Sequence, residues 1–263
     1  MKNNINTISS WYGRFGNNIQ QICNGIIFSV FNDEGFFSPR HDLINEIVVN
    51  ADIRNNINSN RFFHYNTSNK DFNIDLDYLY SNIRKIAKKY ITPNLKFNIG
   101  IPFDDETLVI HIRSGDIFQI EFNPPHAYAP NPLIYYKNLI KNFKKVILVT
   151  ENDDYNPIIP ELKKYKNVTI QSLSISEDFS TLMRAKNLAS SGIGTFAVAA
   201  ALCSLNIKNF YCSDLYLNEH LNPEMLIKSN DINVNIQKLE KYIKTREWTN
   251  SSEQRKFILE YVQ

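Results

Sequence analysis

The stretch TLVIHIRSGDIF, residues 107–118, joins an apolar run to a compact group of polar side chains. Its first four residues have the apolar character of a buried strand, and the next six offer an imidazole, a guanidinium, a hydroxyl, a glycine and a carboxylate. In an open sheet of parallel strands, ligands bind outside the carboxyl ends of the strands. The stretch therefore indicates an α/β fold with a binding site directly after this strand.

The alternation of strand and helix continues toward the C-terminus. Apolar runs predict strands at KKVILVT, NVTI, NLASS and NIKNFYCS, and helical spacing predicts helices over residues 132–143, 156–165, 177–187 and 194–205. Continuous apolar strands separated by helices indicate a parallel sheet with helices on both faces. The tail from residue 232 onward is predicted to be helical and broken near Trp248.

A second alternation precedes the opening stretch. The patterns predict a short strand over residues 5–11, helices over 17–32 and 76–90, and candidate strands at GFFSP and EIVVN. The Pro-bearing segment TPNLKF separates this region from the alternation that restarts near residue 100. We therefore predict two lobes, an N-terminal lobe over residues 1–103 and a C-terminal lobe over 104–263.

Composition excludes several classes of protein. A chain of 263 residues with 43% hydrophobic and 13% aromatic residues can bury a large core. Its 29 basic and 27 acidic residues nearly cancel and are interspersed, which argues against a nucleic-acid or membrane surface as the partner. Any anion that the protein binds must therefore be held by local groups.

The ends of the chain and the cysteines bear on its compartment. The N-terminal MKNNINTISSWYG lacks an apolar signal region, and FAVAAALC is too short to span a bilayer. We therefore expect a cytoplasmic protein without an integral membrane segment. Cys23, Cys203 and Cys212 lie among apolar neighbours without a C-x-x-C pair, which predicts buried thiols. Composition leaves the oligomeric state open.

The cluster after residue 110 offers a phosphate ligand. An arginine fork is planar, permanently charged and suited to bidentate contact with phosphate oxygens, so Arg113 is the first candidate. His111 alternates with Arg113 and projects to the same side if the strand extends that far. The alternative is a structural salt bridge between Arg113 and Asp116 at the strand end.

The segment LASSGIGTF, residues 188–196, offers a second anion site. It ends a predicted strand near Ser191, turns through glycines that include Gly194, and opens an Ala-rich helix with Thr195. Free backbone amides at a helix N-terminus favour an anion such as a diphosphate. The alternative is that the hydroxyls only cap the helix and the glycines only turn the chain.

A third segment, YGRFGNN at residues 12–18, is a glycine turn that enters a helix but matches neither a Rossmann fingerprint nor a P-loop. Together the three segments resemble the fucosyltransferase superfamily, which includes α1,2-, α1,6- and protein O-fucosyltransferases. GRFGNN is similar to the family's G-x-x-G-N-Q turn, HIRSGD to its H-x-R-R-G-D motif, and SGIGTFAVAAAL to its Ser-Ser/Thr-Phe-Ser segment.

The resemblance implies two Rossmann-like lobes that face a cleft, the GT-B architecture, and an inverting glycosyltransferase that uses a nucleotide sugar, GDP-fucose, and a glycan acceptor. The expected lack of an anchor and a signal suits an enzyme of polysaccharide biosynthesis. The resemblance implies that Arg113 contacts the β-phosphate and that Asn17 lies close to sugar and acceptor. It also places Asp178, Thr195 and Phe196 along the donor site, with Arg14 and Gly16 facing them across the cleft. The residue patterns add His111, Ser191 and Gly194 as candidates for substrate binding. Ser114 and Asn18 depart from the family pattern, which weakens the assignment of sugar and acceptor.

The expected chemistry requires no metal and no cofactor. Glycosyl transfer develops negative charge on the leaving diphosphate, which a guanidinium and helix-terminal amides can stabilise. Asp75 and Asp77 form an acidic pair of the kind that can hold a metal ion. They precede a predicted helix, so we interpret them as a solvated N-terminal charge pair. Three residues are candidates for a catalytic base: Asp116, Glu121 and His126.

Aromatic residues and other function classes complete the sequence-based picture. Tyr128 is a candidate for stacking on a sugar, whereas Tyr135 and Tyr136 are interpreted as core residues, and Trp11 and Tyr12 as candidates for the acceptor side. Two alternatives remain open. One is another transferase on the same scaffold, with a different nucleotide sugar or pyruvyl transfer. The other is a non-catalytic carbohydrate-binding protein.

Overall fold

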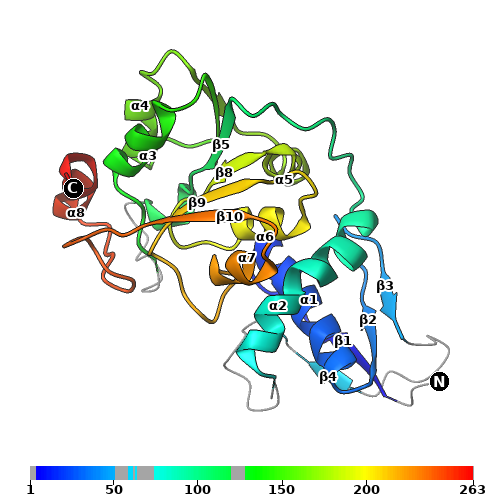
Figure 1. Cartoon of the computed structure of the whole chain (residues 1–263). Coiled ribbons are helices and arrows are strands. Elements are labelled where there is room, and N and C mark those ends of the chain that lie inside the picture. Colours follow the sequence, from blue (N-terminus) through cyan, green and yellow to red (C-terminus); the bar gives the residue numbers. More distant parts are fainter. Residues whose placement is uncertain (1–3, 51–58, 62, 64–73, 120–127, 263) are drawn as a thin grey trace.

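The computed structural model describes residues 4–50, 59–61, 63, 74–119 and 128–262. Its strands form two separate sheets, one built before residue 62 and the other after residue 106 (Figure 1). No strand pairs across the two sheets within these residues, as the restart of the alternation near residue 100 predicts. Within the same residues, no helix combines the length and apolarity needed to cross a membrane.

The larger sheet has six strands, all parallel, in the order β10-β9-β8-β5-β6-β7. From β5 the chain moves outward through β6 to β7, then crosses back to β8 and continues through β9 to β10, which is the strand order of a Rossmann sheet. The order therefore reverses between β5 and β8. The strands are β5 (Thr107–His111), β6 (Lys145–Val149), β7 (Val168–Gln171), β8 (Asn187–Ala189), β9 (Asn209–Ser213) and β10 (Asn233–Gln237).

Helices cover both faces of this sheet, which confirms the predicted α/β class. Alternate residues of β5 point to opposite faces, because side chains alternate along a strand. Val109 joins the core on the α5 and α6 side, whereas Leu108 and Ile110 join the core on the α3 and α8 side. The helices are α3 (Leu133–Ile140), α4 (Ile158–Leu162), α5 (Ile175–Arg184), α6 (Phe196–Cys203), α7 (Glu224–Ser229) and α8 (Ser252–Glu260).

The smaller sheet has four strands in the order β3-β2-β1-β4, of which only β3 is antiparallel to its neighbour. The strands are β1 (Ile5–Ile8), β2 (Gly35–Ser38), β3 (Ile47–Val49) and β4 (Ser59–Arg61). The accompanying helices are α1 (Phe15–Phe31) and α2 (Leu76–Ile86), which continues as a π-helical turn (Ala87–Ile91) and a 3-10 turn (Thr92–Asn94). Asp75 caps α2 by accepting from Asp77 N at 3.1 Å, as the charge-pair interpretation predicts.

The two halves meet through α6, whose residues from Ala197 to Cys203 are all buried. Helix α1 packs on one side of it, and a single apolar cluster includes Ile19 and Ile22 of α1 together with Phe179 of α5 (Figure 1). The small alanine side chains allow helices to approach closely, which explains an Ala-rich sequence at this position. The division of the chain at residues 103 and 104 stays a prediction.

The prediction of a helical tail from residue 232 onward is wrong at its start. Residues 233–237 form β10, which pairs in parallel with β9 at the sheet edge. Val234 and Ile236 alternate with Asn and Gln, a strand period that the polar composition hides. Farther along, Ser251 caps α8 by accepting from Gln254 N, and Trp248 is buried before this helix.

Other predicted boundaries shift by a few residues. The strand predicted over residues 5–11 ends at Ile8, and the helix predicted over 76–90 is α-helical only to Ile86. Tyr135 and Tyr136 are buried in the core, as predicted, and so are the three free cysteines. The candidate strands at GFFSP and EIVVN are confirmed as β2 and β3.

Candidate active site

The reversal of strand order between β5 and β8 fixes where a ligand can enter the larger sheet. Loops that leave neighbouring strands in opposite directions diverge, and the crevice between them is the usual ligand site of such sheets. The loop after β5 carries Arg113 and the loop after β8 carries Ser191, Gly194 and Thr195. The two segments that sequence reasoning selected therefore meet at one switch point.

Arg113 is the most strongly bonded of the candidate residues. Its side chain is only 14% exposed, and its Nη2 donates to Asp116 at 2.8 Å from Oδ2 and 3.0 Å from Oδ1. The guanidinium also lies over the ring of Tyr128, 4.1 Å from the centroid, and donates to the Tyr128 hydroxyl. The salt bridge considered as an alternative for Arg113 is therefore present, and Tyr128 holds the guanidinium plane.

Arg14 joins the same cluster from the other half of the molecule. It lies at the start of α1, and its guanidinium contacts Glu151 Oε1 at 2.7 Å and Asp116 Oδ1 at 3.2 Å. Partial burial lowers the pKa of Arg14, but Asp116 and Glu151 offset this effect and leave it above its usual value. Two guanidinium groups from opposite halves thus share one carboxylate.

The turn that carries Arg14 is fixed by polar side chains of α1. Gly13 has a φ of +68°, in the left-handed region that favours glycine. The Asn18 amide donates to Tyr12 O at 3.1 Å, and Gln21 accepts from Tyr12 N at 3.0 Å. Asn18 also bonds His41 Nε2 at 3.2 Å. Asn18, at the position where the resembled family has glutamine, therefore helps to fix this turn.

Two acidic residues that sequence reasoning missed hold the loop after β5. Glu151 Oε2 accepts from Ser114 N at 2.7 Å, and Asp153 Oδ2 accepts from Gly115 N at 2.9 Å. The Ser114 hydroxyl also donates to Asp153. Ser114, where the family motif has a second arginine, thus has a structural role in this chain. The available signal was ENDD directly after the apolar run KKVILVT, at another strand end.

The N-termini of α1 and α6 touch each other beside this cluster. The Thr195 hydroxyl donates to Asn17 Oδ1 at 2.7 Å and makes no side-chain cap to its own helix. A Cβ added to Gly16 would lie 2.6 Å from Thr195 Oγ1 and 2.9 Å from Phe196 N, so only glycine fits there. Thr195 therefore does not cap its own helix through its side chain, which instead joins α6 to α1.

His111 lies under the loop after β8. Its ring is 5.2 Å from the Phe196 ring, and its Nδ1 is 3.5 Å from Ser191 Oγ. Burial, opposed by Glu151 and reinforced by Arg113 and Arg14, lowers the pKa of His111 to about 4. At neutral pH the imidazole is therefore uncharged and can act only as a neutral donor or acceptor.

We expect the neutral state of His111 to make stability depend on pH. The pKa is about 6.5 in an unfolded chain and about 4 in the folded protein, so His111 stabilises the fold fully above pH 6.5 and loses this contribution as the pH falls toward 4. The expected loss is at most about 3 kcal/mol. Denaturant unfolding between pH 7 and 4 should show a shallower pH dependence for His111→Asn than for the wild type. Equal slopes would contradict the assignment.

The remaining candidates lie outside the arginine cluster or outside the described residues. Asp178 accepts from Gln171 Nε2 at 2.8 Å and from Leu173 N at 3.2 Å, which ties down the loop after β7. Burial raises the pKa of Asp178. A Cβ added to Gly194 would meet only Ser191 Oγ, at 3.7 Å. Glu121 and His126 lie outside the described residues.

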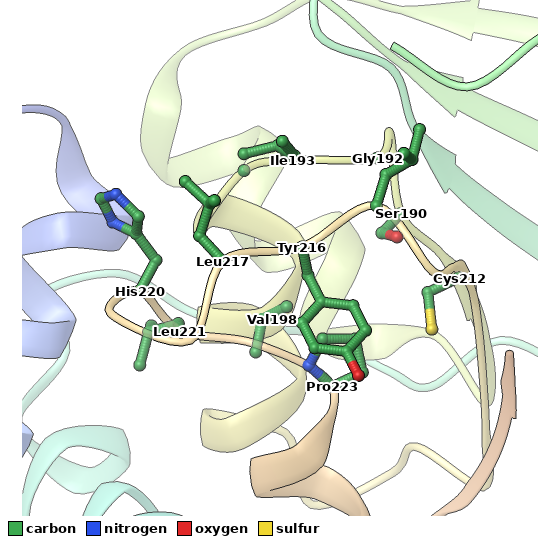
Figure 2. Close-up of a pocket in the computed structure, with 12 residues that line it drawn as sticks. Ser190, Gly192, Ile193, Val198, Cys212, Tyr216, Leu217, His220, Leu221 and Pro223 are labelled. Carbon is green, nitrogen blue, oxygen red and sulfur yellow. The ribbon is translucent and has the colours of Figure 1, made fainter. Parts of the chain in front are cut away.

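A small, mainly apolar pocket lies behind the loop after β8 (Figure 2). Ile193 lines it from this loop, and Leu217 and Leu221 line it from the loop after β9. His220 extends from the same loop toward α1. Arg113 does not line this pocket, so the charged cluster and the apolar hollow are separate features of the same sheet edge. Within the described residues, no group of three His, Cys, Asp or Glu side chains is placed to hold a metal ion.

The fold and the position of the cluster define the chain as an α/β protein with a Rossmann-type sheet. Two arginines, Arg14 and Arg113, lie at its switch point with their carboxylate partners. Neither a family model nor a curated protein matches the sequence. Among solved structures it is similar to POFUT1 in complex with GDP-fucose, with a TM-score of 0.43, 9% identity, and coverage of 91% of this chain and 98% of that chain. It is also similar to POFUT1 in complex with GDP, with a TM-score of 0.42, 11% identity, and coverage of 80% and 97%.

Proposed function

We propose that this protein is a glycosyltransferase that transfers fucose from GDP-fucose to a glycan acceptor, with inversion. The observation that supports the proposal most directly is the pair of guanidiniums, Arg113 and Arg14, at the switch point of a Rossmann-type sheet. They stand beside the N-terminus of α6, whose backbone amides also favour an anion. This combination suits the diphosphate of a nucleotide sugar.

The chemistry then follows from where charge develops. When the bond between the anomeric carbon and the diphosphate breaks, the sugar becomes oxocarbenium-like and the leaving diphosphate gains negative charge. The guanidinium of Arg113 is held over the ring of Tyr128. In our proposal it therefore offers an already oriented fork to the oxygens of the leaving diphosphate. Arg14 adds a second charge from the opposite half. Asn17, bonded to Thr195, would then lie on the side of the sugar and acceptor.

Asp116 is the described candidate for the base that accepts the acceptor's proton. Its carboxylate oxygens are bonded to Arg113 and Arg14. In our proposal it can act as a base only after this carboxylate has left the two guanidiniums. An inverting transfer with little help from a base is equally consistent with the charges at this site, since the leaving group is already stabilised.

A nucleotide panel tests the proposal and the alternatives left open by the sequence. We expect GDP to raise the melting temperature more than UDP, ADP or CMP, and we expect GDP-fucose to be hydrolysed slowly in the absence of an acceptor. Stabilisation by a different nucleotide would favour another transferase on the same scaffold. Binding of glycans without stabilisation by any nucleotide would favour a carbohydrate-binding protein.

We expect the transferase activity to survive chelation of metal ions. In our proposal Arg113, Arg14 and backbone amides supply the positive charge that a divalent ion supplies in other glycosyltransferases. Turnover of GDP-fucose measured with and without EDTA should agree within error. A loss of activity in EDTA that Mn²⁺ or Mg²⁺ restores would overturn this part of the mechanism.

A further inference from the structure

We propose that Asp116 is an internal anion that competes with the diphosphate for Arg113 and Arg14, and so sets the affinity of the site for nucleotides. The inference rests on the proposed function and concerns the regulation of the same site. Asp116 contacts both guanidiniums, which come from opposite halves of the molecule. It therefore occupies the place between two cations where a bridging phosphate group would be most stable.

Asp116 occupies one bidentate edge of Arg113. Nε and Nη2 of Arg113 both face the Asp116 carboxylate, and Nη1 donates to Tyr128. A diphosphate that binds through the Nε–Nη2 edge must therefore take the place of the carboxylate. A diphosphate elsewhere on the guanidinium would be repelled by the negative charge of Asp116.

Asp116 is the partner in this cluster that can leave. Within the described residues, its carboxylate accepts hydrogen bonds from Arg113 and forms an ion pair with Arg14, and it contacts no backbone amide. Its side chain is 31% exposed, so it can turn toward water. Glu151 differs because its second oxygen accepts from Ser114 N at 2.7 Å and anchors it to the loop.

Arg113, by contrast, is held in place without Asp116. Its guanidinium lies 4.1 Å from the centroid of the Tyr128 ring, and its side chain is 14% exposed. When Asp116 turns away, Arg113 therefore keeps its orientation and presents its fork to the incoming phosphate. The same exchange in reverse assists release of the nucleoside diphosphate after transfer.

Calorimetric titration of Asp116→Asn with GDP and with inorganic pyrophosphate tests the inference. We expect both ligands to bind about tenfold or more tightly to this variant than to the wild type, because the amide carries no charge and competes weakly for the guanidiniums. Asp116→Ser should show the same increase in affinity for both ligands, so it provides the test if Asp116→Asn folds poorly.

Glu161→Gln is the matched control for net charge. Glu161 is a surface carboxylate that pairs with Lys164 at 2.6 Å on α4, away from the cluster. This variant should bind GDP and pyrophosphate as the wild type does. If the wild type binds GDP and both Asp116 variants bind it no more tightly, Asp116 is not a competitor, although the proposed function stands. If no variant and no wild-type protein binds GDP, the inference and the proposed function fall together.

Discussion

Replacing Arg113 with alanine is expected to lower turnover by about 100-fold or more, the scale of losing one oriented donor to developing negative charge. The structure adds a reason for this size. Arg113 is fixed by Tyr128 at 4.1 Å and lies at the switch point of the sheet, so its fork is oriented before the reaction begins. Charge on the diphosphate grows as the glycosidic bond breaks, and the arginine therefore contributes more to the rate than to substrate binding.

Two further variants separate catalysis from structure. Arg113→Lys keeps the charge but loses the planar fork and its stacking, so we expect it to recover little activity. Arg184→Ala is the control, because Arg184 also stacks on an aromatic ring, Phe103 at 4.2 Å, but at the C-terminal end of α5. It should lower stability without changing turnover per folded molecule. A similar result for Arg113→Ala would mean that Arg113 is structural.

Replacing Gly16 with valine is the second change with a large expected effect. The added Cβ would lie 2.6 Å from Thr195 Oγ1 and 2.8 Å from Thr195 C, so α1 and α6 must move apart at their N-termini. Overpacking of this kind costs about 1–3 kcal/mol. The movement also breaks the 2.7 Å hydrogen bond from Thr195 to Asn17. We therefore expect a lower free energy of unfolding and, under the proposed function, weaker binding of the donor.

Gly194→Ala provides the matched control for Gly16. A Cβ at Gly194 meets only Ser191 Oγ at 3.7 Å, an ordinary contact, so the variant should retain the stability of the wild type. Denaturant unfolding and calorimetric titration with GDP measure both effects on the same samples. If Gly16→Val unfolds at the same denaturant concentration as Gly194→Ala, the close approach of the two helices is not important for stability.

Much of the larger sheet could be predicted from the sequence because its strands are continuous apolar runs. Leu108, Val109 and Ile110 are all fully buried. A parallel strand with a core on each face requires apolar side chains at successive positions, so it appears in the sequence as a continuous apolar run. The edge strand β10 could not be found in the same way. None of its five residues is fully buried, and Asn233, Asn235 and Gln237 give it the composition of a surface helix or loop.

The candidate site could be predicted in part for a similar reason. His111, Arg113 and Thr195 follow apolar runs directly, so a local pattern marks them. Glu151 and Asp153 follow such a run as well, but their importance depends on β6 lying next to β5, which only the folded sheet determines. The sharing of Asp116 by two arginines likewise depends on the packing of α1 against α6, which no local pattern describes.

The apolar cluster that runs through both halves also limits how the molecule can move. Rotating one sheet away from the other would expose α6, whose residues from Ala197 to Cys203 are buried, and would put much of this cluster in contact with water. A hinge between the halves is therefore a costly motion for this chain. Under the proposed function, entry of the donor and release of the product must therefore occur at the sheet edge without opening of the two halves.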